Sequence, residues 1–147
     1  AERASLLAGL KPAAVLSLHL DSYTDPRLSG PSTYILPAHQ TTDADASARL
    51  AGAILAGLAP VATGPLQRPV QEPLAVLRVP GAASVLLETA YLTNPEDRAR
   101  IASPATRATY ADAIARALTG HLRDRDRIIP QNLPISTKMV CPVKDAC

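Results

Sequence analysis

The fold of this chain is decided by residues 84–95, SVLLETAYLTNP. An unbroken apolar run of this kind is typical of a strand covered on both faces, because successive side chains point to opposite sides of a sheet. The run ends at Glu88, so we expect this carboxylate at the carboxyl end of a central strand, the edge where open α/β sheets bind ligands. Asn94 and Pro95 then predict a helix start, since asparagine caps helices and proline suits the first helical position.

A second apolar run, residues 13–22 (AAVLSLHLDS), ends in polar side chains in the same way. Its His19 and Asp21 are two residues apart and therefore share one face of a strand. If the two strands are parallel neighbours, His19 and Glu88 meet at one rim, as a metal ligand and a general base would. We expect Asp21 to line this rim or to cap the following turn. A histidine or a glutamate at a strand end is also often purely structural.

Strands and helices alternate along most of the chain. The pattern predicts strands at 14–20, 32–37, 74–79 and 83–90. It predicts helices at 2–10, 41–58, 95–102 and 103–121. Such alternation indicates a layered α/β domain, with a mostly parallel sheet flanked by helices. After residue 122 an alternating charge run is followed by three prolines, so we assign 1–122 to the domain and 123–147 to a C-terminal extension or linker.

The composition excludes several classes of function. The chain has 147 residues, of which 47% are hydrophobic, as expected for one globular domain. Its net charge of +2 is too small to indicate a nucleic-acid partner, and no apolar run approaches the ~18 residues of a transmembrane helix. His39 is expected on the surface, and His121 near a helix C-terminus, where its charge is favourable without any function. Cys141 and Cys147 form either a small disulfide loop or two free thiols.

The two apolar runs together resemble the zinc-dependent N-acetylmuramoyl-L-alanine amidases, which cleave bacterial cell wall. LSLHLDS (16–22) is similar to the family's strand of the type ISIHAD, which carries a zinc-binding histidine. VLLETAYLTNP (85–95) is similar to its segment VLVETGFLSNP, which carries the catalytic glutamate. Further segments that resemble the family follow its order: GPSTYIL (30–36), SARLA (47–51) and VLR (76–78). The resemblance covers the chain from residue 1 to about residue 122.

The resemblance implies a hydrolase that acts on peptidoglycan in the periplasm or cell envelope after export from the bacterial cytoplasm. Its substrate would be the amide that joins N-acetylmuramic acid to L-alanine. Glu88 would be the catalytic base and acid, and His19 would be one zinc ligand. The family's other two ligands, a histidine of a GHGG-type loop and a glutamate of the next helix, lie upstream of the position equivalent to residue 1.

The chain therefore resembles an incomplete domain, which lacks the N-terminal strands and carries half a zinc site. Two classes of function stay open. In the first, the chain is part of an amidase that needs an upstream segment, or a separate chain holding that segment, for its remaining ligands. In the second, it is a zinc-free, non-catalytic relative that binds peptidoglycan or a protein partner. A third reading, an unrelated α/β domain, predicts that His19 and Glu88 lie far apart.

Overall fold

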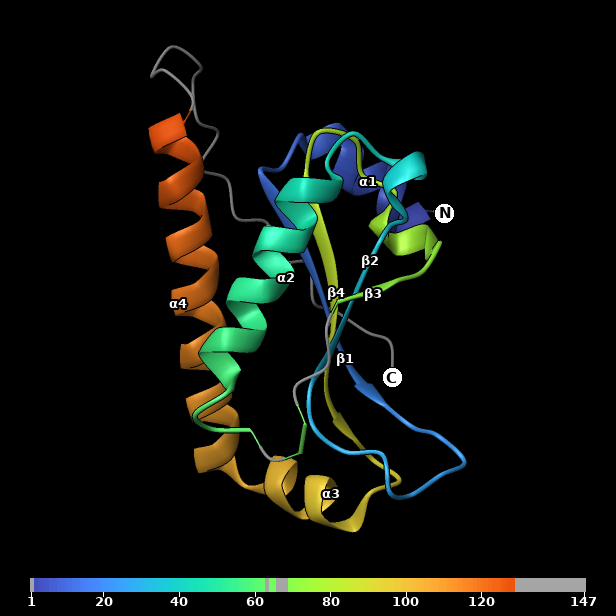
Figure 1. Cartoon of the computed structure of the whole chain (residues 1–147), viewed down its shortest axis with the longest axis vertical. Coiled ribbons are helices and arrows are strands. Elements are labelled where there is room, and N and C mark those ends of the chain that lie inside the picture. Colours follow the sequence, from blue (N-terminus) through green and yellow to red (C-terminus); the bar gives the residue numbers. More distant parts are fainter. Residues whose placement is uncertain (1, 63, 66–68, 129–147) are drawn as a thin grey trace.

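A four-stranded sheet with helices on both faces forms the computed structural model, which describes residues 2–62, 64–65 and 69–128 (Figure 1). The strands are β1 (Ala14–Asp21), β2 (Ser32–Ile35), β3 (Val70–Gln71) and β4 (Ala83–Tyr91). The helices are α1 (Glu2–Leu10), α2 (Ala44–Leu58), α3 (Pro95–Ala102) and α4 (Pro104–Ile128). Two short 3₁₀ helices are η1 (Ala38–Gln40) and η2 (Ala75–Leu77). The predicted α/β class is confirmed.

The sheet is organised around β4, as the sequence predicts. Its strand order is β1-β4-β2-β3, and all nine residues of β4 are buried. β1 runs parallel to β4, with Ala14 opposite Ala83 at the start of the pair. β2 is antiparallel to β4, and the short β3 is parallel to β2. Two of the three strand pairs are therefore parallel.

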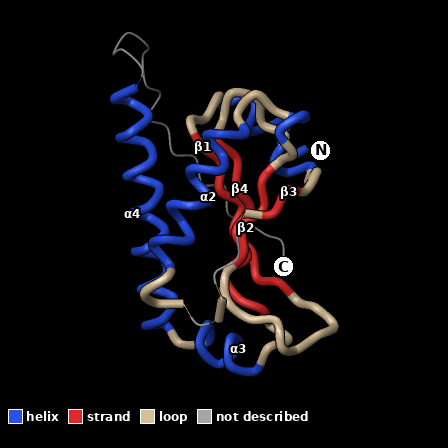
Figure 2. The backbone as a smooth tube through the Cα atoms, viewed as in Figure 1, coloured by secondary structure: helices blue, strands red, loops and turns tan. Residues whose placement is uncertain are grey.

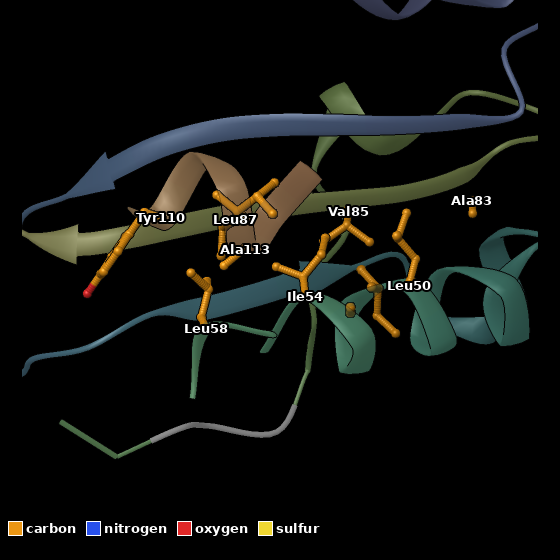
Figure 3. Close-up of a cluster of buried hydrophobic side chains, with 11 residues drawn as sticks. Leu50, Ile54, Leu58, Ala83, Val85, Leu87, Tyr110 and Ala113 are labelled. Carbon is orange, nitrogen blue, oxygen red and sulfur yellow. The ribbon is translucent and has the colours of Figure 1, made fainter. Parts of the chain in front are cut away.

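The apolar side chains of β4 divide between the two faces of the sheet. Val85 and Leu87 pack against the side that α2 and α4 cover, as Figure 3 shows. The shared core of this side is completed by Leu50, Ile54, Leu58, Tyr110 and Ala113. Leu86 points to the opposite face, where it packs with Leu36 and Leu77. Burial on both faces is what an unbroken apolar run predicts for a central strand.

The predicted strand at 74–79 is wrong. This segment forms η2, in which the Leu77 N–H donates to the Leu74 carbonyl at 3.1 Å. Pro73 and Pro80 enclose the segment, and proline has no N–H to extend a sheet ladder. The place beside β2 is taken by β3 (Val70–Gln71), inside a stretch that the sequence predicts to be a loop.

Several other boundaries differ from the predicted ones, among them the start of α2, which is Ala44 and not residue 41. β2 ends at Ile35, two residues before Pro37. α4 continues to Ile128, so His121 lies inside the helix and not near its end. The charge run that opens the predicted extension lies in the last turns of this helix. Residues 129–147, with Cys141 and Cys147, lie outside the described residues. Within the described ranges, no helix combines the length and the apolar character that a membrane crossing requires.

Candidate active site

His19 and Glu88 lie side by side at the carboxyl end of the β1–β4 pair. They are direct partners in the parallel register. Side chains of paired residues on neighbouring strands point to the same face, so the imidazole and the carboxylate share one side of the sheet. Leu87, the residue before Glu88, packs into the core that α2 and α4 cover. Because successive side chains of a strand alternate, Glu88 and His19 lie on the opposite face of the sheet. The hypothesis of an unrelated α/β domain predicted that His19 and Glu88 lie far apart, and this prediction is wrong.

The Glu88 carboxyl is buried and incompletely hydrogen-bonded. Its residue is only 9% exposed, and Oε2 has no hydrogen-bond partner among the described residues. Burial, and to a smaller extent the nearby charge of Asp21, raise the pKa of Glu88 to about 7. A carboxyl with such a pKa holds a proton in part of the molecules at neutral pH. This is the property that a general acid–base group needs.

His19 presents its imidazole near the surface. The ring nitrogen Nε2 lies 2.8 Å from Ser17 Oγ, on the same face two residues earlier. The His19 carbonyl accepts a hydrogen bond from Thr89 Oγ1 at 3.0 Å, which ties β1 to β4 at this level. Ser17 thus holds the exposed ring through one of its two nitrogens. A hydrogen bond on the second nitrogen is how proteins orient metal-binding histidines.

Asp21 lies at the rim of the same site. The regular register ends between His19 and Asp21, and Asp21 pairs with Tyr91 instead of the residue expected from uniform spacing. Its Oδ1 accepts a hydrogen bond from the N–H of the next residue, Ser22, at 2.7 Å. The charge of Asp21 raises the pKa of Tyr34 as well as that of Glu88, although burial is the main cause in both. Asp21 therefore lies close to both groups.

The loops that follow β1 and β4 are joined to each other at this end of the sheet (Figure 2). Asn94 caps α3 as predicted, because its Oδ1 accepts hydrogen bonds from the N–H groups of Glu96 and Asp97, each at 3.0 Å. Its Nδ2 donates to the Pro26 carbonyl at 2.8 Å. The cap of α3 thus also holds the loop after β1.

Asp97 is a structural residue of this end that the sequence analysis missed. It is 4% exposed, and its Oδ2 accepts hydrogen bonds from the N–H groups of Gly30 and Tyr91, both at 2.9 Å. These bonds fix the chain just after Glu88 and just before β2. An acidic residue in a first helical turn suggests only a favourable interaction with the helix dipole. The two amides that Asp97 binds are visible only in the folded chain.

A complete zinc site does not form within the described residues. In that part of the chain, no three side chains of His, Cys, Asp or Glu come close enough to hold a metal together. Protein zinc sites use three or four such ligands. His19 offers one donor atom of the right kind. His39 lies in η1 beside Gln40, as predicted for a surface residue, and His121 lies in α4, so neither joins the site.

Comparison with known proteins identifies the family of the chain. The sequence matches the N-acetylmuramoyl-L-alanine amidase family over residues 1–120. The chain belongs to this family. The resemblance to the N-acetylmuramoyl-L-alanine amidases is therefore confirmed, and the match includes residues 16–22 and 84–95. No curated protein matches the chain.

Solved amidase structures share the fold. Ami1 from Mycobacterium smegmatis is 30% identical with a TM-score of 0.74, and the match covers 84% of this chain and 60% of that one. AmiC2 of Nostoc punctiforme is 25% identical with a TM-score of 0.70, covering 83% of this chain and 64% of that one. An amidase from Clostridium difficile 630, 20% identical with a TM-score of 0.74, covers 84% and 65% and shows the fold alone. The chain spans 60% to 65% of these amidases.

Proposed function

We propose that this chain supplies part of the catalytic site for hydrolysis of the amide between N-acetylmuramic acid and L-alanine in peptidoglycan. The observation that carries this proposal is the pairing of His19 with a buried Glu88 whose pKa is raised to about 7. Membership of the N-acetylmuramoyl-L-alanine amidase family supports the substrate class. Because peptidoglycan lies outside the cytoplasmic membrane, the proposal includes export to the periplasm or cell envelope of a bacterium.

Glu88 is proposed to move the proton. In its ionised form the carboxylate accepts a proton from the attacking water through Oε2, the atom that has no hydrogen-bond partner in the described part of the chain. In its protonated form it returns the proton to the leaving amine of L-alanine. One carboxyl can take both roles, because it is ionised when the water attacks and protonated when the amine leaves.

His19 is proposed as one ligand of a zinc ion. Bound zinc supplies a Lewis acid for the amide carbonyl and an acidified water. Such an ion needs about three protein ligands, and the described residues provide no group of three. The remaining ligands are therefore proposed to come from an upstream segment of the same protein or from a separate chain that contains it.

The outer edge of β1 supports an upstream partner. β1 is the first strand of the described sheet, and its Leu18 and Leu20 are 60% and 45% exposed. Beside them a cavity of about 520 Å³ is lined by Ile101, Tyr110 and Ile114. Exposed apolar side chains on an unpaired strand edge are uncommon in native proteins unless another segment covers them.

A second function is favoured by one observation. Because no three ligating side chains meet within residues 2–62, 64–65 and 69–128, the chain also fits a zinc-free relative that binds peptidoglycan or a protein partner without cleaving it.

The test is an amidase assay on the protein at the length at which cells make it, supplied with zinc and N-acetylmuramoyl-L-alanyl peptides. The signal is the newly released amino group of L-alanine. Glu88→Gln is expected to lower the rate by about 10²-fold or more, the range for loss of a general acid–base group. Glu96→Gln, which neutralises an exposed carboxylate at the start of α3, should leave the rate unchanged.

Two outcomes decide between the candidates. A Glu88→Gln protein as active as the unaltered one would contradict the catalytic role. Binding to insoluble peptidoglycan without any amine release from the unaltered protein would favour the zinc-free relative.

A further inference from the structure

A second cavity lies at the opposite end of the sheet from Glu88. It has a volume of about 870 Å³, within the usual range for ligand sites. Ala13 and Ala83, at the amino ends of β1 and β4, line its base. Glu88 is near the carboxyl end of β4, so the two sites share strands but no residues.

The cavity exists because α2 and α4 diverge. The helices lie close together at Gly57, where a Cβ atom would lie 3.3 Å from the Ala113 carbonyl oxygen. Towards the C-terminal end of α4 the two helices separate (Figure 1). The residues that line the gap there are small, among them Ala46 and Ala53 of α2 and Gly120 of α4. Small side chains leave the space between the helices open.

Cationic side chains from both helices line this space. Arg49 comes from α2, while Arg116, His121 and Arg125 come from α4. Arg49 and Arg116 form no hydrogen bond or ion pair with any other residue of the described ranges. A guanidinium offers five N–H donors, so both side chains have donors to give to a ligand.

Acidic residues only partly balance these cations. Asp43 and Asp124 also line the cavity. Asp43 is engaged by the chain itself, because its Oδ2 accepts the Gly81 N–H at 3.0 Å. Three arginines against two aspartates leave the site positive even with His121 neutral.

The positive charge of the cavity acts on His121. Burial is the largest cause that lowers the pKa of this imidazole, and the charges of Arg49 and Arg125 lower it further. Asp124 acts in the opposite direction. Since Arg49 belongs to α2 and His121 to α4, the two helices bring their cationic groups to one place.

We propose that this cavity binds the phosphate group of a phosphate ester or diester. A carboxylate is planar, and the fork of one arginine satisfies it. A tetrahedral phosphate presents oxygens in several directions, which suits donors contributed by two different helices. The alanine and glycine lining leaves room for the organic group that the phosphate carries.

The test measures binding of two probes to the 147-residue chain at fixed ionic strength. The first probe is inorganic phosphate, followed by calorimetry. The second is a set of vesicles of phosphatidylglycerol, compared with vesicles of phosphatidylcholine. Arg49→Gln and Arg116→Gln are expected to weaken binding about tenfold each, as loss of a charge-assisted hydrogen bond does.

Arg123→Gln is the matched control. Arg123 is exposed on the same helix and does not line the cavity, so its loss removes the same charge outside the site. Binding to this variant should stay within about twofold of the unaltered chain, because a solvent-exposed charge outside the cavity is screened and contributes little to binding inside it. Circular dichroism of all variants checks that the fold is kept.

Each outcome bears on the proposal. Binding of free phosphate that depends on Arg49 and Arg116 assigns a soluble phosphate ester as the ligand. Binding of phosphatidylglycerol vesicles alone, with the same dependence, assigns a lipid headgroup. Equal losses in all three variants, or no binding of either probe to the unaltered chain, would overturn the proposal.

Discussion

At the scale of single residues, Glu88 connects the stability of the fold to pH. Its pKa is about 7 in the folded chain, against 4.5 for an ordinary glutamate. Between these values the folded state binds more protons than the unfolded state, so the free energy of unfolding decreases as pH rises through this window. The loss is on the order of 2–3 kcal/mol for a shift of this size.

Urea unfolding of the metal-free chain at pH 5 and pH 8 measures this effect. Glu88→Gln is expected to reduce the difference between the two pH values, because the amide does not ionise. Glu72→Gln, at an exposed position, should leave the difference as it is. A Glu88→Gln chain with the full pH dependence would mean that the carboxyl is solvated.

Asp97 gives a second prediction at this scale. Asp97→Ala removes the acceptor of the Gly30 and Tyr91 N–H groups and leaves both without their partner. Each unsatisfied buried donor costs about 1–3 kcal/mol, so we expect a destabilisation of about 2–4 kcal/mol in urea unfolding. Asp112→Ala, at an exposed position of α4, should change stability by less than about 0.5 kcal/mol. Equal effects of the two substitutions would show that the two bonds contribute nothing.

The two residues differ in how far the sequence could predict them. The place of Glu88 follows from the apolar run before it, and the shared face with His19 follows from strand alternation. The hydrogen-bonding role of Asp97 depends on Gly30, which is 67 residues away in the chain. A contact of this range is decided by tertiary packing, and no local pattern predicts it.

At the scale of elements, the glycines of α2 are predicted to behave differently. Nothing lies within 4 Å of a Cβ atom added at Gly52, so Gly52→Ala should stabilise the helix by about 0.5–1 kcal/mol. Gly57 lies against the Ala113 carbonyl of α4. Gly57→Leu should force the two helices apart and destabilise the fold by about 1–3 kcal/mol. Thermal unfolding of both variants tests this, and a stabilising Gly57→Leu would refute the close helix contact.

The 3₁₀ helix η2 shows the limit of periodicity. The segment LAVLRV (74–79) is a short apolar run of the kind that favours a strand. The flanking prolines argue against a strand, but a sequence does not reveal which segment pairs with the edge strand of a sheet. β3 holds that edge with only two residues, and the Glu72 N–H extends the contact by donating to the Ile35 carbonyl at 2.9 Å.

At the scale of the whole molecule, the layered architecture could be predicted from alternating elements, while the strand order could not. From the sequence, the meeting of His19 and Glu88 was conditional on β1 and β4 being parallel neighbours, and the structure fulfils this condition. The antiparallel insertion of β2 between β4 and β3 joins segments with no common local signal. Family membership then supports the substrate class that we propose for the candidate site, which geometry alone does not provide.

The central claim is that His19 and Glu88 are one part of a zinc amidase site whose other ligands lie outside the described residues. The most direct measurement is the zinc content of the purified 147-residue chain, and of its His19→Ala variant, after dialysis against a weak chelator. We expect both to retain far less than about one zinc per chain, because one histidine and one carboxylate do not hold zinc tightly. About one zinc per chain, lost in the His19→Ala variant, would contradict the claim, since the chain would then complete the site by itself.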